Sequence, residues 1–201
     1  MSHGWIYKAV KVHIGYFEIK LLSVIVSSKG KRADPEKVEM LLSMWRLENS
    51  AEVRSFVRLA DWFQEHCKGI AWNIMIVNKL SVAGSEFLWT AAVEEKFQWI
   101  KKQMKSLTVL VLWSGGKTSC LYTDSSIKGM GCFLTQLDED DKMEVVIAFG
   151  SIALTWTQMK YHPPRSSRIY LVAWTFSRVS MCSSIYMEDG SQSIEIHIQC
   201  F

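Results

Sequence analysis

The stretch Thr108–Gln136, TVLVLWSGGKTSCLYTDSSIKGMGCFLTQ, places one carboxylate among apolar and small residues. Its first apolar run ends at a Gly-Gly turn signal, and its second run ends at Asp124. A Ser-Ser-Ile-Lys-Gly turn signal follows, and a third run then begins. Apolar runs of this length, bounded by glycine and serine, are typical of strands. We therefore predict three strands, with Asp124 at the end of the second.

Three amphipathic helices are predicted before this stretch. Asp34-Pro35 indicates a helix start, because aspartate caps free amides and proline fits the first helical position. Asn49 and Glu52 have the spacing of a capping box for a second helix, and a third runs from about Thr90 to Lys105. Apolar residues recur with the helical period in all three. The inward residues are predicted to be Val38, Leu41, Leu42 and Trp45, then Val53, Phe56, Val57, Ala60 and Phe63, and finally Val93, Phe97, Ile100 and Met104.

Further strands are predicted toward both ends of the chain. Two apolar clusters in Lys11–Ser27, with a turn signal at Ser28-Lys29-Gly30, indicate a hairpin. Met143–Phe149 continues the central meander, Ser166–Val179 has a helical period, and Ile194–Gln199 alternates as a strand does. We expect an α+β fold, mainly helical in its first half and built on an antiparallel sheet in its second.

The composition indicates a globular chain with a weak positive charge. Hydrophobic residues make up 49% and the net charge is +3, which permits contact with nucleic acid without indicating it. Five cysteines without zinc or CxxC spacing suit reduced thiols. The longest early apolar run falls far short of the roughly 20 residues that span a membrane, and the N-terminus has no secretory pattern. We expect an intracellular protein, cytoplasmic or nuclear, without a targeting signal or a membrane partner.

A series of short motifs lies along the chain at fixed spacing. They are Val26-Ser27-x-x-Gly30, Asp34-Pro35-Glu36-Lys37-Val38-Glu39, Glu52-Val53-Arg54-Ser55-Phe56, Leu59-Ala60, Phe87-x-Trp89, Glu94-x-x-Phe97, Lys101, Val109-Leu110, Thr123-Asp124-Ser125-Ser126 and Gly131. Together they resemble the polyproteins of gypsy-type LTR retrotransposons, without a gap from about Lys11 to Gln136. Arg58 and Asp61 depart from the family pattern, because they stand where it has glycines.

The resemblance implies the end of a reverse transcriptase palm, a β-hairpin, in 1–33. It also implies a helical thumb and connection in 34–106 and an incomplete, divergent RNase H-like sheet with one helix in 107–201.

The resemblance implies a chemistry for Asp124. In this family RNase H, a hydrolase and endonuclease, cleaves the RNA of an RNA–DNA hybrid with two Mg²⁺ ions that several carboxylates hold. Asp124 matches the first carboxylate, as a catalytic and metal-binding residue. The second should follow Tyr161-His162, but 161–187 contains no Asp or Glu, and the third position falls on Gln199. Because Mg²⁺ prefers several oxygen ligands, we expect weak Mg²⁺ binding and impaired hydrolysis.

Other candidate functional residues remain, each with a structural alternative. The family's polymerase motif is expected upstream of this sequence, so RNA-directed DNA synthesis is not expected of it. Ser114–Thr118 lacks the full phosphate-loop spacing, and we predict a hairpin turn there. Lys101, Lys102 and Lys105 could contact phosphates, or simply suit the negative end of their helix. Asp124 could be an inherited residue bonded to nearby serine hydroxyls.

Four function hypotheses therefore stay open. The chain could be a reverse transcriptase/RNase H fragment acting on RNA–DNA hybrids, with hydrolysis weakened. It could be a non-catalytic remnant that binds hybrid or other nucleic acid through its lysines. It could be a decayed product with no selected role, or a subunit that works with a complete reverse transcriptase.

Overall fold

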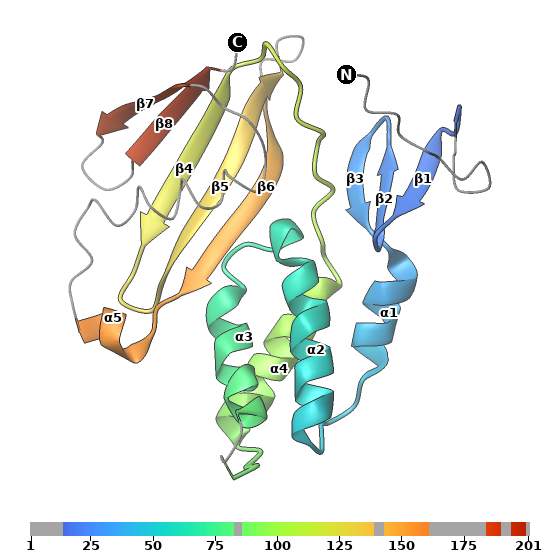
Figure 1. Cartoon of the computed structure of the whole chain (residues 1–201), viewed down its shortest axis with the longest axis vertical. Helices are drawn as coiled ribbons and strands as arrows, with labels where there is room; N and C mark the ends of the chain where they lie inside the picture. Colours follow the sequence, from blue (N-terminus) through green and yellow to red (C-terminus); the bar gives the residue numbers. More distant parts are fainter. Residues whose placement is uncertain (1–13, 83–85, 139–142, 161–183, 190–193, 200–201) are drawn as a thin grey trace, which may run out of the picture.

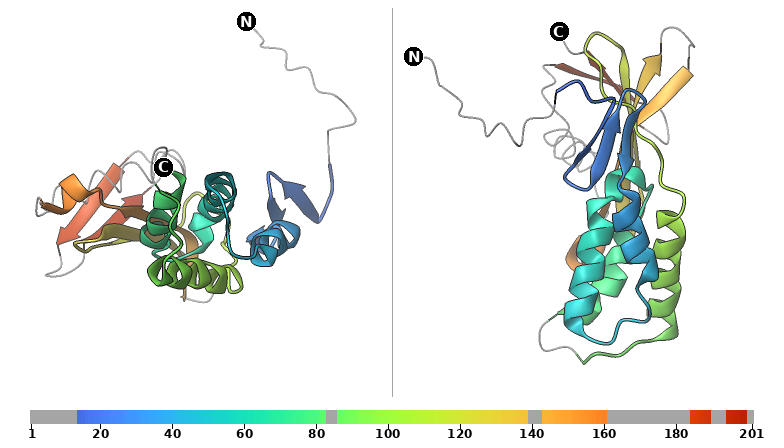
Figure 2. Two further views of the ribbon diagram at one scale, coloured as in Figure 1. Left: turned by 90° about the horizontal axis from the view of Figure 1, so that it is seen from below. Right: turned by 90° about the vertical axis from the view of Figure 1, so that its right-hand side faces the viewer.

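The computed structural model describes residues 14–82, 86–138, 143–160, 184–189 and 194–199 (Figure 1). A small sheet and a larger sheet lie above a group of helices, so the predicted α+β fold is confirmed. The small sheet and β7–β8 lie at opposite ends of the molecule (Figures 1 and 2). The elements are β1 (Glu18–Leu21), β2 (Val24–Ser27), β3 (Gly30–Ala33), α1 (Pro35–Ser43), α2 (Ser50–Trp62), η2 (Gln64–His66), α3 (Ala71–Asn78), η3 (Lys79–Ser81), α4 (Ala91–Met104), β4 (Ser119–Ser125), β5 (Gly129–Asp138), β6 (Met143–Ala153), α5 (Trp156–Lys160), β7 (Ser184–Asp189) and β8 (Ile194–Gln199).

The small sheet has three antiparallel strands, in the order β1-β2-β3, where one hairpin was predicted. The predicted turn at Ser28-Lys29 is confirmed between β2 and β3. A second turn lies at Leu22-Ser23, and both residues have positive φ, 48° and 66°. Hairpin turns with positive φ usually carry glycine or asparagine. Because this turn carries leucine and serine, the apolar run concealed it.

Helix α1 begins as predicted at Asp34. One carboxylate oxygen, Oδ1, accepts from the Glu36 backbone N–H at 3.2 Å, and the other, Oδ2, lies 2.7 Å from Lys20 Nζ. Leu41 is buried on the inward face. The inward position predicted for Trp45 is wrong, since its side chain is 88% exposed. The helix ends at Ser43 and Met44 is extended, so Trp45 no longer follows the helical period.

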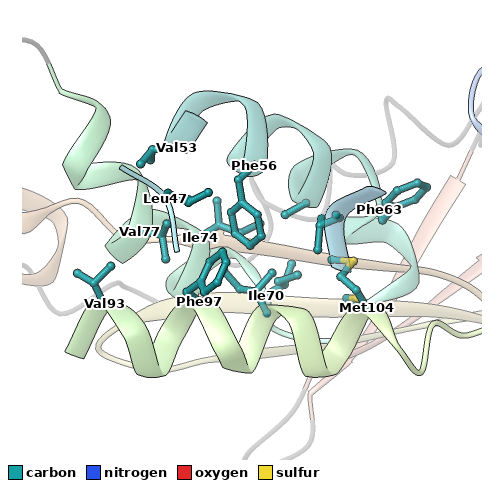
Figure 3. Packing of buried hydrophobic residues seen from close by; sticks show 14 of the residues in the cluster. Leu47, Val53, Phe56, Phe63, Ile70, Ile74, Val77, Val93, Phe97 and Met104 are labelled. Carbon is teal, nitrogen blue, oxygen red and sulfur yellow. The ribbon is translucent and has the colours of Figure 1, made fainter. Parts of the chain in front are cut away.

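Helices α2, α3 and α4 enclose the main hydrophobic core. Phe56 of α2 and Phe97 of α4 pack with ring centroids 4.7 Å apart, beside Ile74 of α3 (Figure 3). The predicted N-cap is confirmed at α2, where Asn49 Oδ1 accepts from the N–H groups of Ala51 and Glu52. The Glu52 carboxylate accepts from the Glu48 N–H, one residue before the position that a capping box requires. Helix α3 was not predicted. Its residues are apolar on nearly all sides, because α2, α4 and β6 surround it.

The segment 108–113 is not the strand that we predicted. Leu110 alone forms an isolated antiparallel bridge with Lys31 of β3, through backbone bonds of 2.7 and 2.9 Å. The next residue, Val111, donates to the Val146 carbonyl of β6. The segment therefore connects the two sheets. The predicted hairpin turn after it is also wrong, because no paired strand precedes Gly115-Gly116; the Gln136 side chain holds this loop through both backbone groups of Ser114.

The larger sheet has the strand order β6-β5-β4-β8-β7, with antiparallel neighbours throughout. This confirms the predicted meander and the predicted strand Ile194–Gln199, whereas β7 was not predicted. The helix predicted for Ser166–Val179 lies outside the described residues. Among the helices that the structure describes, none is long and apolar enough to cross a membrane.

His66 fixes the end of α2 against the connecting segment. Its side chain is 3% exposed, and Nδ1 donates to the Thr108 carbonyl at 2.8 Å. Nε2 has no hydrogen-bond partner among the described residues. Burial lowers the pKa of His66 below its ordinary value of 6.5, and the nearby Lys31 ammonium lowers it further. The folded protein thus holds this imidazole neutral.

We expect the stability of the protein to fall as the solution is acidified below about pH 6.5, the pKa of an unperturbed histidine. The unfolded chain takes up a proton on His66 there, while the folded chain does so only at lower pH. The stabilisation is therefore complete above this pH and decreases toward the lower folded-state pKa. Urea unfolding across this range measures it. His66→Asn can keep the donor to Thr108 without titrating; an unchanged pH slope in this variant would contradict the assignment.

Candidate nucleic-acid site around Asp124

A cavity of about 450 Å³ lies between the N-terminal end of α3 and strands β4, β5 and β6. Cavities of this size hold small ligands in other proteins. Asp124 is among the residues that line it, together with Lys68, Trp72, Tyr122 and Lys128. The predicted site residue therefore faces a pocket that both halves of the chain build.

The end of β4 and the turn after it determine the place of Asp124. Asp124 pairs with Gly131 in the β4–β5 ladder, and its side chain is exposed. In the turn, the Ser126 N–H donates to the Gly129 carbonyl at 2.8 Å, and the Ser126 hydroxyl donates to the same carbonyl at 3.1 Å. The Ser126 hydroxyl also accepts from the Gly129 N–H. This hydroxyl thus stabilises its own turn.

Aromatic rings and lysines line the same cavity as Asp124. Tyr122 and Phe133 stack with centroids 4.6 Å apart and an interplanar angle of 14°. Lys68 Nζ lies 5.7 Å from the Phe133 ring centroid, and Lys128 Nζ lies 5.9 Å from that of Trp72. Both distances suit an attraction between a cation and a ring face. The sequence analysis missed Lys68, Trp72 and Lys128, because no local motif joins residues that only the packing of α3 on the sheet brings together.

The residues of this cavity do not fit a pair of magnesium ions. Among the residues that the structure describes, Asp124 is the only acidic one that lines it, and Lys68 and Lys128 line it too. Magnesium requires several oxygen ligands and is repelled by nearby ammonium groups. Within the described part of the chain, no group of three or more His, Cys, Asp and Glu residues could hold a metal ion. The expected second carboxylate position, after Tyr161-His162, falls in 161–183, outside the described residues.

Gln199 does not come near Asp124 in this sheet. Strand β8 runs antiparallel to β4, with Thr123 opposite Ile194 and Ser119 opposite Ile198. Gln199 therefore lies beyond the Ser119 end of β4, whereas Asp124 lies at the other end. The match between Gln199 and a third ligand position thus brings no further ligand to the Asp124 site.

The three lysines predicted to contact phosphates, at the C-terminal end of α4, have different environments. Lys101 Nζ donates to the Met44 carbonyl at 2.7 Å and lies 5.2 Å from the Phe97 ring centroid. Burial lowers the pKa of Lys101. Its side chain thus joins the end of α1 to the core, while Lys102 and Lys105 are exposed. Of the three predicted phosphate-binding residues, these two are accessible to a polyanion.

Comparisons with known proteins agree with this fold. Residues 89–180 match the model of the RNase H-like domain found in reverse transcriptase, and this range includes Asp124. The chain is 25% identical over 138 residues, 69% of its length, to the retrovirus-related Pol polyprotein from transposon 412 of Drosophila melanogaster. It is 24% identical over 144 residues, 72% of its length, to the transposon Tf2-3 polyprotein of Schizosaccharomyces pombe. Each match spans 11% of the relative.

Among solved structures, the foamy viral protease-reverse transcriptase has a similar fold. Its complex with an RNA/DNA hybrid aligns with a TM-score of 0.65 and 14% identity, over 81% of this chain and 22% of the viral chain. Its complex with dsDNA aligns with a TM-score of 0.67 and 14% identity, over 83% of this chain and 36% of the viral chain. The chain is thus similar to retrotransposon polyproteins at low identity and shares a fold with a reverse transcriptase. The gypsy-type assignment and the thumb and connection boundaries remain predictions.

Proposed function

We propose that this chain is a nucleic-acid-binding piece of a gypsy-type retrotransposon reverse transcriptase. Residues 1–33 would be the end of the palm, 34–106 the thumb and connection, and 107–201 a divergent RNase H-like domain. The observation that supports this proposal most strongly is the position of Asp124. It lies one residue before the end of β4, within the matched segment, and lines a cavity with Lys68 and Lys128. An RNA–DNA hybrid is the proposed partner, since a similar fold in a foamy viral enzyme was solved with one. The proposed compartment is the cytoplasm or nucleus.

Hydrolysis of the RNA strand is the inherited reaction class, and we propose that it is impaired here. Asp124 would be the one carboxylate of the described site to ligate Mg²⁺. A single carboxylate beside two ammonium groups holds a divalent cation poorly, because the ammonium charges oppose its binding. The retained property is then electrostatic attraction to phosphates, to which exposed lysines contribute.

The binding proposal predicts retention of a labelled RNA–DNA hybrid that weakens as salt rises, because the binding of phosphates releases counterions. Replacing Lys102 and Lys105 by glutamine should lower the slope of log affinity against log salt by about 2, since each lysine accounts for about 1. Lys29→Gln, at the exposed turn of the small sheet, is the matched control and should leave the slope unchanged. Absence of retention even at low salt would sink the proposal and favour a decayed product without a selected role.

A further inference from the structure

We propose that the cavity between α3 and strands β4–β6 binds a nucleotide without a metal ion, its phosphate on Lys68 and Lys128 and its base against Trp72. This inference rests on the proposed function for the choice of a nucleotide over other aromatic phosphates. It goes beyond that function in two respects. It names the pocket that binds the nucleotide, and it states that no metal ion connects the protein to the phosphate.

The charges of the lining favour an anion. Lys68 and Lys128 give two positive charges and Asp124 gives one negative charge, so the described part of the lining carries a net charge of +1. Among the described residues, neither lysine forms an ion pair with a carboxylate. Each is instead directed over an aromatic ring, Lys68 over Phe133 and Lys128 over Trp72. The two ammonium groups are thus available to a phosphate.

The shape and surface of the lining suit a planar ring beside that phosphate. The cavity volume of about 450 Å³ is within the range of small-ligand sites. Trp72 is half-buried and lines the cavity from α3, while Met130 and Ile152 line it from the sheet. Aromatic side chains stack on bases of any sequence. The Ala71 N–H donates to the Ser151 hydroxyl at 3.2 Å, so α3 is bonded to β6 beside the cavity.

Glycine at 131 keeps the cavity open. Gly131 lines the cavity, and a Cβ built there would meet only the Gly150 carbonyl oxygen, at 3.9 Å. This is an ordinary van der Waals distance, so the backbone tolerates a larger residue at this position. A valine suits a strand and would occupy the space intended for the ligand. Gly131→Val therefore narrows the cavity while leaving the charges of Lys68, Lys128 and Asp124 in place.

The role of Asp124 differs between a metal site and a nucleotide site. Asp124 would be required if Mg²⁺ bridged the protein to the phosphate. In the metal-free site its carboxylate repels the phosphate and directs it toward the lysines. Asp124→Asn should therefore leave nucleotide affinity unchanged or raise it. The effect of Asp124→Asn on nucleotide affinity therefore distinguishes a metal site from a metal-free nucleotide site.

Equilibrium dialysis of the full chain with AMP, and separately with a 5′-phosphorylated oligothymidylate, both in EDTA, tests the inference. We expect saturable binding that weakens by about tenfold in Lys68→Gln/Lys128→Gln, which removes charge-assisted hydrogen bonds. Gly131→Val should weaken it as well, and Lys29→Gln should not. Binding of AMP assigns a free nucleotide, while binding of the oligonucleotide alone assigns the end of a strand; either result supports the cavity.

Three outcomes would overturn the inference. One is the absence of binding by both probes while the chain still retains the RNA–DNA hybrid, which leaves the proposed function standing. Another is binding that requires Mg²⁺ and is lost in Asp124→Asn. The third is binding that survives in both the double lysine variant and Gly131→Val, with circular dichroism showing that each is folded. If hybrid retention fails too, the proposed function fails with the inference.

Discussion

Phe97→Ala is expected to lower the free energy of unfolding by about 3–5 kcal/mol, the usual cost of removing a buried phenylalanine. The Phe97 side chain is 1% exposed at the centre of the helical core. Its ring contacts Phe56, and it meets Trp89 edge-on with centroids 5.4 Å apart. Since α2, α3 and α4 all pack around this cluster, the cavity left by the substitution should weaken all three. Urea unfolding followed by far-UV circular dichroism measures the change.

Phe17→Ala is the matched control for this substitution. The Phe17 side chain is 97% exposed, so its removal should change the free energy of unfolding by no more than about 0.5 kcal/mol. Equal losses in the two variants would mean that Phe97 is not the centre of the core. The arrangement of the three helices would then be wrong.

Gly30→Ala is expected to cost about 3 kcal/mol or more, by strain and overlap together. Gly30 has a φ of 125°, which favours glycine, and a Cβ built there would overlap the Leu110 carbonyl oxygen. That oxygen accepts the Lys31 N–H of the isolated bridge. The substitution must therefore push the connecting segment away from β3. Hydrogen exchange at the Leu110 and Lys31 amides should rise together with the loss of stability.

Gly116→Ala separates the stability lost through backbone strain from that lost through atomic overlap. Gly116 has a φ of 86°, and a Cβ built there would meet no atom within 4 Å. It should show the backbone strain alone, on the order of 1–2 kcal/mol. If Gly30→Ala costs no more than Gly116→Ala, the close approach between β3 and the connecting segment is absent.

The elements that the sequence predicted correctly have one buried face and a local end signal. Helix α1 has Asp34 and α2 has Asn49, and each cap bonds to the backbone as its spacing indicated. Where these signals fail, the reasons are specific. Helix α3 has no side-chain cap and no polar face. The segment around Leu110 is apolar, but Leu110 alone is buried there and Val109 and Leu112 are exposed.

The candidate site was predictable only in part. Asp124 could be found because it ends a strand beside a turn signal. Lys68, Lys128 and Trp72 could not be found, since they match no motif and reach the cavity only through the packing of α3 on the sheet. Lys101 shows the reverse case, because its place near a helix end suggested a phosphate contact and gave no sign of a bond within the fold. Its Nζ instead donates to the Met44 carbonyl within the fold.

The most direct measurement is cleavage of a labelled RNA strand in an RNA–DNA hybrid by the purified chain with Mg²⁺. We predict that the hybrid is bound, that the RNA stays intact, and that Asp124→Asn changes neither result. A single described carboxylate with two lysines beside it is the basis for this prediction. Cleavage of the RNA strand that Asp124→Asn abolishes would contradict it, because that result requires a working metal site at Asp124.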